Sequence, residues 1–210
     1  MPGNTLLQDV SMVDHRELRR QMLHLFFGTL FLILIYVEFL TSWSIFILIV
    51  VLGIVSYAST KFTLPVINEL IERYERPYDA DKFPGRGPIL MLVGILLSLK
   101  LFPRDIALAS IAVLAFGDSI SHLVGARFGR RKSIFSPSSP KLLEGTVAGS
   151  IAGFFAALAF VEPVEAFFGS LLAMIAESAE IDMNKRPVDD NMVVPLVAGT
   201  VMLILRSYGF

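Results

Sequence analysis

The feature that most constrains this chain is a series of long apolar runs separated by short polar segments. The 210 residues are 54% hydrophobic, include 17 Phe and have a mean hydropathy of +0.67. Soluble domains are usually about 45–50% apolar. Because the excess is gathered into runs of membrane-crossing length, the sequence predicts an all-α integral membrane protein.

We expect one polytopic membrane domain over residues 1–210, with about seven transmembrane helices. Several of these are at the short end of the ~17–25 residues that a helix needs to cross the hydrocarbon, and the weakest pattern is the third. The predicted spans are residues 22–40, 43–59, 88–102, 105–125, 143–161, 164–181 and 191–208.

Basic residues predict the orientation of these spans. Fifteen of the 18 Lys and Arg residues fall in the N-terminal tail or in the loops after the second, fourth and sixth spans. The positive-inside rule then places the N-terminus in the cytoplasm and the C-terminus outside. Residues 1–21 become a cytoplasmic segment without a cleaved signal peptide, and residues 60–87 a cytoplasmic loop with a short amphipathic helix at 68–76.

Composition excludes several kinds of function. The chain has no cysteine, which excludes disulfides, zinc–thiolate sites and thiol catalysis. The net charge of −1 argues against nucleic acid as a partner.

Four carboxylates lie inside or at the ends of the predicted spans: Asp118, Glu144, Glu177 and Asp190. A carboxylate at membrane depth costs roughly 2.5–3.5 kcal/mol on insertion scales, so each one is a functional hypothesis. All four fall on the predicted cytoplasmic side, where nucleotides are found. Together they suggest a cation site, and a cation site suggests phosphate chemistry.

The first motif surrounds Asp118. Asp118, Ser121, His122 and Gly125 form one helical stripe, and a basic run at residues 127–132 follows them. Magnesium usually takes one or two carboxylates plus substrate phosphates, and the basic run would neutralise a polyphosphate. Asp118 could instead make a structural contact between helices, and the basic run could be a plain positive-inside anchor.

The second motif joins Lys141 and Glu144 to glycines 145, 149 and 153. Glycines spaced by four residues are typical of closely packed membrane helices. Gly145 would also let a phosphate approach the backbone at the start of a helix.

Two further motifs contain candidate site residues. Glu177 precedes Asp190 and Asn191, and either of the latter two would cap the last span. Near the N-terminus, Arg20 and His24 are four residues apart and face the same way. They would contact substrate, or they are simply polar residues at the membrane interface.

In this order, the motifs resemble those of the CTP-dependent lipid-alcohol kinases, the family of dolichol kinase, phytol kinase and CTP-dependent diacylglycerol kinase. The resemblance covers most of the chain and is strongest from residue 117 to residue 199. The residues that carry it are Glu17, Arg19, Arg20, His24, Gly117, Asp118, Gly125, residues 128–132, Lys141, Glu144, Gly145, Thr146, Glu177, Asp190, Asn191, Pro195 and Leu196.

The resemblance implies transfer of the γ-phosphate of CTP to a lipid hydroxyl, with a catalytic core at residues 105–208. Asp118, Glu144 and Asp190 would coordinate Mg²⁺ or another divalent cation, and Glu177 would be the base for the lipid hydroxyl. Arg20 and His24 are expected substrate contacts. The expected nucleotide and phosphate ligands are Gly117, Ser121, His122, Gly125, Arg130, Arg131, Lys132, Lys141, Gly145, Thr146 and Asn191.

The leading hypothesis is a polyprenol (dolichol-type) kinase in the plasma membrane of a prokaryote, with its site facing the cytoplasm. A lipid cytidylyltransferase would use the same nucleotide but transfer CMP. The motifs would also suit a transporter that uses the carboxylates as an ion path, or a non-catalytic membrane scaffold. The identity of the lipid and the oligomeric state stay open.

Overall fold

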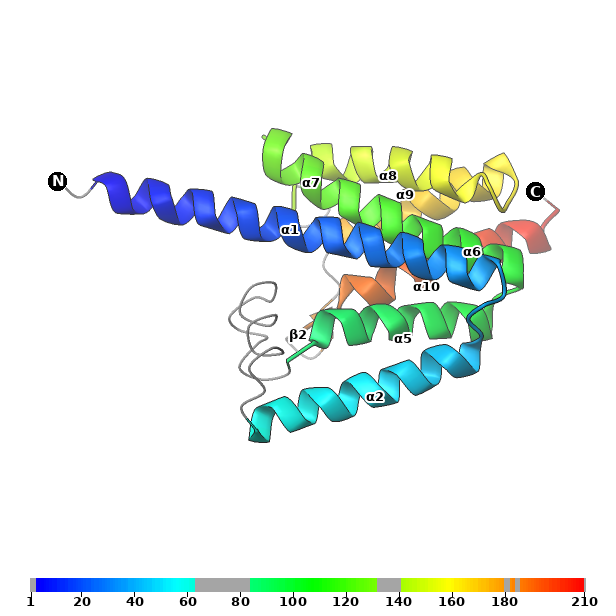
Figure 1. The fold of residues 1–210 in the computed structure, drawn as a ribbon. Coiled ribbons are helices and arrows are strands. Elements are labelled where there is room, and N and C mark those ends of the chain that lie inside the picture. Colours follow the sequence, from blue (N-terminus) through cyan, green and yellow to red (C-terminus); the bar gives the residue numbers. More distant parts are fainter. Residues whose placement is uncertain (1–2, 63–83, 132–140, 180–181, 184–185, 210) are drawn as a thin grey trace.

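The computed structural model describes residues 3–62, 84–131, 141–179, 182–183 and 186–209. Within these ranges the chain is almost entirely helical (Figure 1). The helices are α1 (Gly3–Tyr36), α2 (Ser42–Lys61), α5 (Arg86–Leu101), α6 (Arg104–Ala112), the π-helix η1 (Val113–Asp118), α7 (Ser119–Phe128), α8 (Leu143–Ala157), α9 (Pro163–Ala179) and α10 (Asp190–Ser207). A short antiparallel pair, β1 (Asp182–Met183) and β2 (Arg186–Pro187), precedes α10.

Because α6, η1 and α7 run on without a break, the described residues form seven helical rods, and each matches a predicted span. The boundaries differ most in three places. α1 ends at Tyr36, four residues before the predicted end at residue 40. α1 already begins at Gly3, so residues 3–21 continue the first helix instead of forming a separate segment. α8 ends at Ala157, four residues before the predicted end at residue 161. The predicted amphipathic helix at residues 68–76 lies outside the described residues.

By length and composition, four of the described rods are long and apolar enough to cross a membrane. They are residues 17–36 of α1, all of α2, the α6–η1–α7 rod and α10. α5, α8 and α9 have only 16, 15 and 17 residues. A 15-residue helix is about 22 Å long against a hydrocarbon core of about 30 Å, so these three could span it only if the bilayer is locally thinned.

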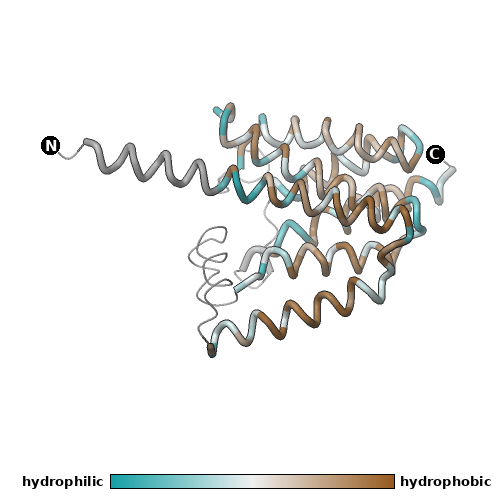
Figure 2. The backbone as a smooth tube through the Cα atoms, viewed as in Figure 1, coloured by the Kyte–Doolittle hydropathy of each residue, from teal (hydrophilic) through white to brown (hydrophobic). Residues whose placement is uncertain are grey.

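Successive rods run in alternating directions, which gathers their ends into two groups (Figure 1). The last turns of α2, α7 and α9 and the first turns of α5, α8 and α10 lie at one end of the bundle, and the C-terminus lies at the other. The middle of the bundle is apolar and the hydrophilic residues gather toward its ends (Figure 2). This is the arrangement expected of a polytopic membrane protein.

The rods pack through small residues. α10 contacts α5, α6, α9 and η1, while α2 packs mainly against α5 in the described part of the chain. The buried face of α8 carries Gly145, Gly149 and Gly153, as the sequence predicts. A Cβ at Gly149 would lie 2.7 Å from the carbonyl oxygen of Gly117, so η1 and α8 touch backbone to backbone. Close approach of this kind replaces the hydrophobic driving force that lipid cannot supply.

A cluster of ion pairs links three helices at the end of the bundle that holds the C-terminus. The guanidinium of Arg206 on α10 donates to both carboxylate oxygens of Glu165 on α9, at 2.8 and 2.7 Å. It also donates to Asp105 on α6, at 2.6 Å. Glu165 is only 1% exposed, so this bidentate pair supplies the compensation that a buried carboxylate requires. Three helices are thereby tied together far from the predicted site.

We expect Gly149→Ala to lower the thermal stability of the protein in detergent, because the new Cβ would also lie 2.8 Å from Met174 Sδ and from Ser121 Cβ. Overpacking of this kind typically costs about 1–3 kcal/mol. The matched control is Gly53→Ala on α2, where a Cβ meets nothing within 4 Å. Equal melting temperatures for the two variants would show that the α8 glycine face is not required for packing.

Candidate cation and phosphate site

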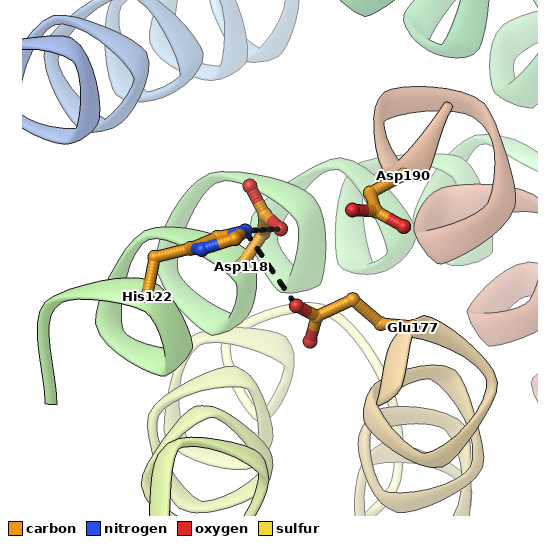
Figure 3. Close-up of side chains that lie close together, drawn as sticks. All are labelled: Asp118, His122, Glu177 and Asp190. Atoms are coloured by element: carbon orange, nitrogen blue, oxygen red, sulfur yellow. Dashed lines mark ion pairs between the residues drawn. The ribbon is translucent and has the colours of Figure 1, made fainter. Parts of the chain in front are cut away.

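Four ionisable side chains from three rods converge at the end of the bundle that holds the first turn of α10. Asp118 is the last residue of η1, His122 lies one turn later on α7, Glu177 is near the end of α9, and Asp190 is the first residue of α10. Figure 3 shows the four side chains pointing toward one another. One ligand atom from each lies within 4.8 Å of the other three, which is close enough to share one metal ion.

The π-helix presents Asp118 to this cluster. Residues 113–118 are wound more widely than an α-helix, and such π-segments are frequently found at functional sites. The side chain of Asp118 is held in the interior, where the residue is 5% exposed. His122 Nε2 lies 3.5 Å from Asp118 Oδ1 and 3.7 Å from Glu177 Oε1. His122 therefore links the carboxylates of two rods.

Asp189, and not Asp190 or Asn191, caps the last helix. The Asp189 carboxylate accepts hydrogen bonds from the backbone N–H of Asn191 at 3.2 Å and from the Asn191 side-chain amide at 2.7 Å. The two capping roles considered from the sequence were therefore wrong. Because Asp189 satisfies the helix N-terminus, the Asp190 carboxylate is available to the cluster.

Lys141 neutralises part of the negative charge. Its ammonium donates to Glu177 Oε1 at 2.8 Å and to Asp190 Oδ2 at 2.7 Å, and so bridges α9 and α10. Burial alone would lower the pKa of Lys141, but Glu177, Asp190 and Asp118 together raise it above its ordinary value. The lysine is therefore charged at neutral pH. Ser121 adds a hydrogen bond to Glu177 Oε2 at 3.2 Å.

The two predicted substrate contacts near the N-terminus, Arg20 and His24, have different partners. His24 on α1 faces the cluster, with its Nε2 3.6 Å from Asp118 Oδ2. Arg20, one turn earlier, donates to Glu17 at 2.6 Å. α1 thus contributes a histidine to the site and keeps Arg20 paired beside it.

Several buried polar atoms of the site have no hydrogen-bond partner within the described ranges. They include Asp118 Oδ1, His24 Nε2 and Asn191 Oδ1. A buried polar group that is left unpaired is costly, so such atoms usually have a ligand in the working protein. A hard cation on the carboxylates, with phosphate oxygens beside the histidine, fits this set of donors and acceptors.

Glu144 does not belong to the cluster, although it was expected among the metal ligands. The described part of the chain gives it a different partner, since its carboxylate accepts the backbone N–H of Arg131 at 3.2 Å. It lines an open groove of about 610 Å³ together with Arg130, Arg131 and the apolar side chains of Val147 and Ile151. This places the two predicted phosphate ligands Arg130 and Arg131 beside Glu144. Lys132 lies outside the described residues.

The small residues predicted to approach phosphate are occupied with helix packing. Gly145 faces α7, where a Cβ would lie 2.5 Å from the carbonyl oxygen of Ser121. Gly117 and Gly125 face α8 in the same way, next to Gly149 and Gly145. Thr146 is buried and its hydroxyl lies 3.5 Å from the Leu142 carbonyl. The three glycines thus bring the η1–α7 rod and α8 together.

Replacing a true cation ligand should weaken divalent-ion binding more than replacing Glu144. We expect Asp118→Asn to weaken Mn²⁺ binding by roughly tenfold or more, since it removes the charge of a ligand in the cluster. Glu144→Gln should leave that binding nearly unchanged, because its carboxylate bonds the Arg131 backbone instead. Titration of Mn²⁺ into purified protein, followed by electron paramagnetic resonance, measures both. The reverse ranking would restore Glu144 as the ligand.

Known proteins resemble this chain over most of its length. It is 31% identical over 192 residues to an uncharacterized protein of Methanocaldococcus jannaschii, covering 89% of this chain and 93% of that one. It is 28% identical to a probable phytol kinase 2 of rice, Oryza sativa subsp. japonica, covering 89% and 65% of the two chains. It is 24% identical to the CTP-dependent diacylglycerol kinase 1 of Schizosaccharomyces pombe, covering 69% and 72%.

No protein-family model matches the chain, and no solved structure matches it either. The assignment therefore rests on these relatives. The chain belongs to the family of CTP-dependent lipid kinases that includes phytol kinases and CTP-dependent diacylglycerol kinase.

Proposed function

We propose that this protein is a membrane kinase that transfers the γ-phosphate of CTP to the hydroxyl of a polyprenol-type lipid, giving CDP and the lipid phosphate. The observation that carries the proposal is the convergence of Asp118, Glu177 and Asp190 with Lys141 in one buried cluster. The names of the relatives support CTP as donor and a lipid as acceptor. The polyprenol is our own choice among lipid alcohols.

Asp118 and Asp190 would hold Mg²⁺, because carboxylate oxygens are the ligands that this ion prefers. Bound there, the ion would neutralise charge on the phosphates of CTP. Lys141 and His24 lie beside the same carboxylates and would contact phosphate oxygens. Phosphoryl transfer depends chiefly on such positioning and charge neutralisation.

Glu177 would act as the base. It is 1% exposed and within reach of the cluster, and a hydroxyl placed beside it would pass its proton to the carboxylate. The lipid oxygen then forms a bond to the γ-phosphorus while the bond from that phosphorus to the oxygen of CDP breaks. Ser121 and His122 hold Glu177 in place from α7.

We further propose that the site faces the cytoplasm of a prokaryotic plasma membrane, where CTP is available. The basic residues favour this orientation under the positive-inside rule. Glu177 lies in the last turn of α9 and Asp190 is the first residue of α10, so these two carboxylates lie at one end of the bundle, which disfavours an ion path through the protein.

The activity is tested with CTP labelled separately at the α and γ positions, in detergent, with polyprenols, phytol, diacylglycerol and the corresponding lipid phosphates as acceptors. We expect γ-label in the lipid fraction, and a decrease of about a hundredfold or more in Asp118→Asn. Asp105→Asn makes the same chemical change at the other end of the bundle and should keep the activity. Label from the α position would establish a cytidylyltransferase instead, and no transfer from either position would contradict both.

The orientation is tested with single cysteines, since the chain has none of its own. Ala126→Cys lies in the last turn of α7 and Tyr208→Cys follows α10, and both positions are exposed at opposite ends of the bundle. We expect a membrane-impermeant maleimide to label Tyr208→Cys in intact cells and Ala126→Cys only after lysis. The opposite pattern would invert the proposed topology.

A further inference from the structure

Lys141 lies inside the group of side chains that would bind the cation. Its ammonium is 2.7–2.8 Å from one oxygen of Asp190 and one of Glu177, and these are two of the four residues whose ligand atoms lie within 4.8 Å of one another. The side chain of Lys141 is 13% exposed, so solvent screens these contacts little. The ammonium therefore stands where a positive charge is needed.

A divalent cation on the same carboxylates would lie close to this ammonium. Mg²⁺ binds carboxylate oxygens at about 2.0–2.1 Å, so an ion on the same oxygen of Glu177 or Asp190 as the ammonium would be at most about 5 Å from the nitrogen. Two positive charges at that separation repel each other strongly in a buried site. They would also compete for the lone pairs of the same oxygens.

We infer that Lys141 serves as an internal counter-ion, which occupies the place of the divalent cation in the empty site and gives it up when the cation binds. This inference rests on the proposed function, because it takes the cluster to be the site of that cation. On leaving the carboxylates, the ammonium turns to the phosphates of the nucleotide that the cation accompanies. Lys141 is then a positioning residue in the empty protein and a phosphate ligand in the loaded one.

The exchange would let three carboxylates share one site before the cation binds. Asp118, Glu177 and Asp190 would repel one another if all were ionised and uncompensated. Lys141 compensates two of them directly, because its ammonium donates to both Glu177 and Asp190. The Asp118 oxygen that lacks a hydrogen-bond partner in the described residues is left for the incoming ion.

The test measures Mn²⁺ binding by electron paramagnetic resonance, without nucleotide, so that its readout does not depend on activity. We expect Lys141→Met to bind Mn²⁺ at least tenfold more tightly than the unchanged protein, since the competing charge is gone. Lys141→Arg keeps a cation that can bridge both carboxylates, so it should bind Mn²⁺ no more tightly than the unchanged protein. Lys100→Met removes an exposed charge at the other end of the bundle and should change nothing.

The outcomes separate the inference from the proposed function. If Asp118→Asn abolishes Mn²⁺ binding but Lys141→Met leaves it unchanged or weaker, the cation site stands and the counter-ion role is overturned. If Lys141→Met does not remain folded, tighter binding by Lys141→Arg would overturn the inference by itself. If the unchanged protein and the Lys141 variants all bind Mn²⁺ no more tightly than Asp118→Asn does, both the cation site and the inference are overturned.

Discussion

The cost of burying negative charge is the constraint on which the rest of this structure depends. Glu177 is 1% exposed and Asp118 is 5% exposed, inside a bundle whose middle is apolar. A buried carboxylate is stable only where a partner compensates for the hydration that it has lost. Lys141 is that partner, and it can reach both Glu177 and Asp190 only because glycine faces let α7, α8 and α9 approach closely. The charge compensation at the site therefore depends on the close packing of the helices.

The number and positions of the helical rods follow from the sequence, because apolar runs between polar loops leave a membrane chain few other choices. The π-helix at residues 113–118 could not be predicted in this way. Its wider hydrogen-bond pattern depends on neighbours in the folded bundle, and not on any local residue preference. The capping of α10 shows a smaller failure of the same kind. Asp189, Asp190 and Asn191 are all good caps, and only the tertiary role of Asp190 decides that Asp189 does the capping.

The site was only partly predictable. Buried carboxylates in a membrane chain marked Asp118, Glu177 and Asp190, and the structure brings them together. Glu144 was grouped with them because it lies at the start of a predicted span, but it precedes Gly145 by one residue, about 100° around the helix. Since Gly145, Gly149 and Gly153 form the packed face of α8, helical periodicity already directed Glu144 away from that face. The bridging position of Lys141 carried no such signal, because it depends on two later helices.

The most direct test of the central claim is a crystal structure with Mn²⁺ and a non-hydrolysable CTP analogue, with the metal located by its anomalous scattering. Our account predicts a metal peak in contact with Asp118 and Asp190, and the Lys141 ammonium moved from Glu177 to the phosphates. A metal peak beside Glu144 and Arg131, with the Lys141 bridge unchanged, would contradict it.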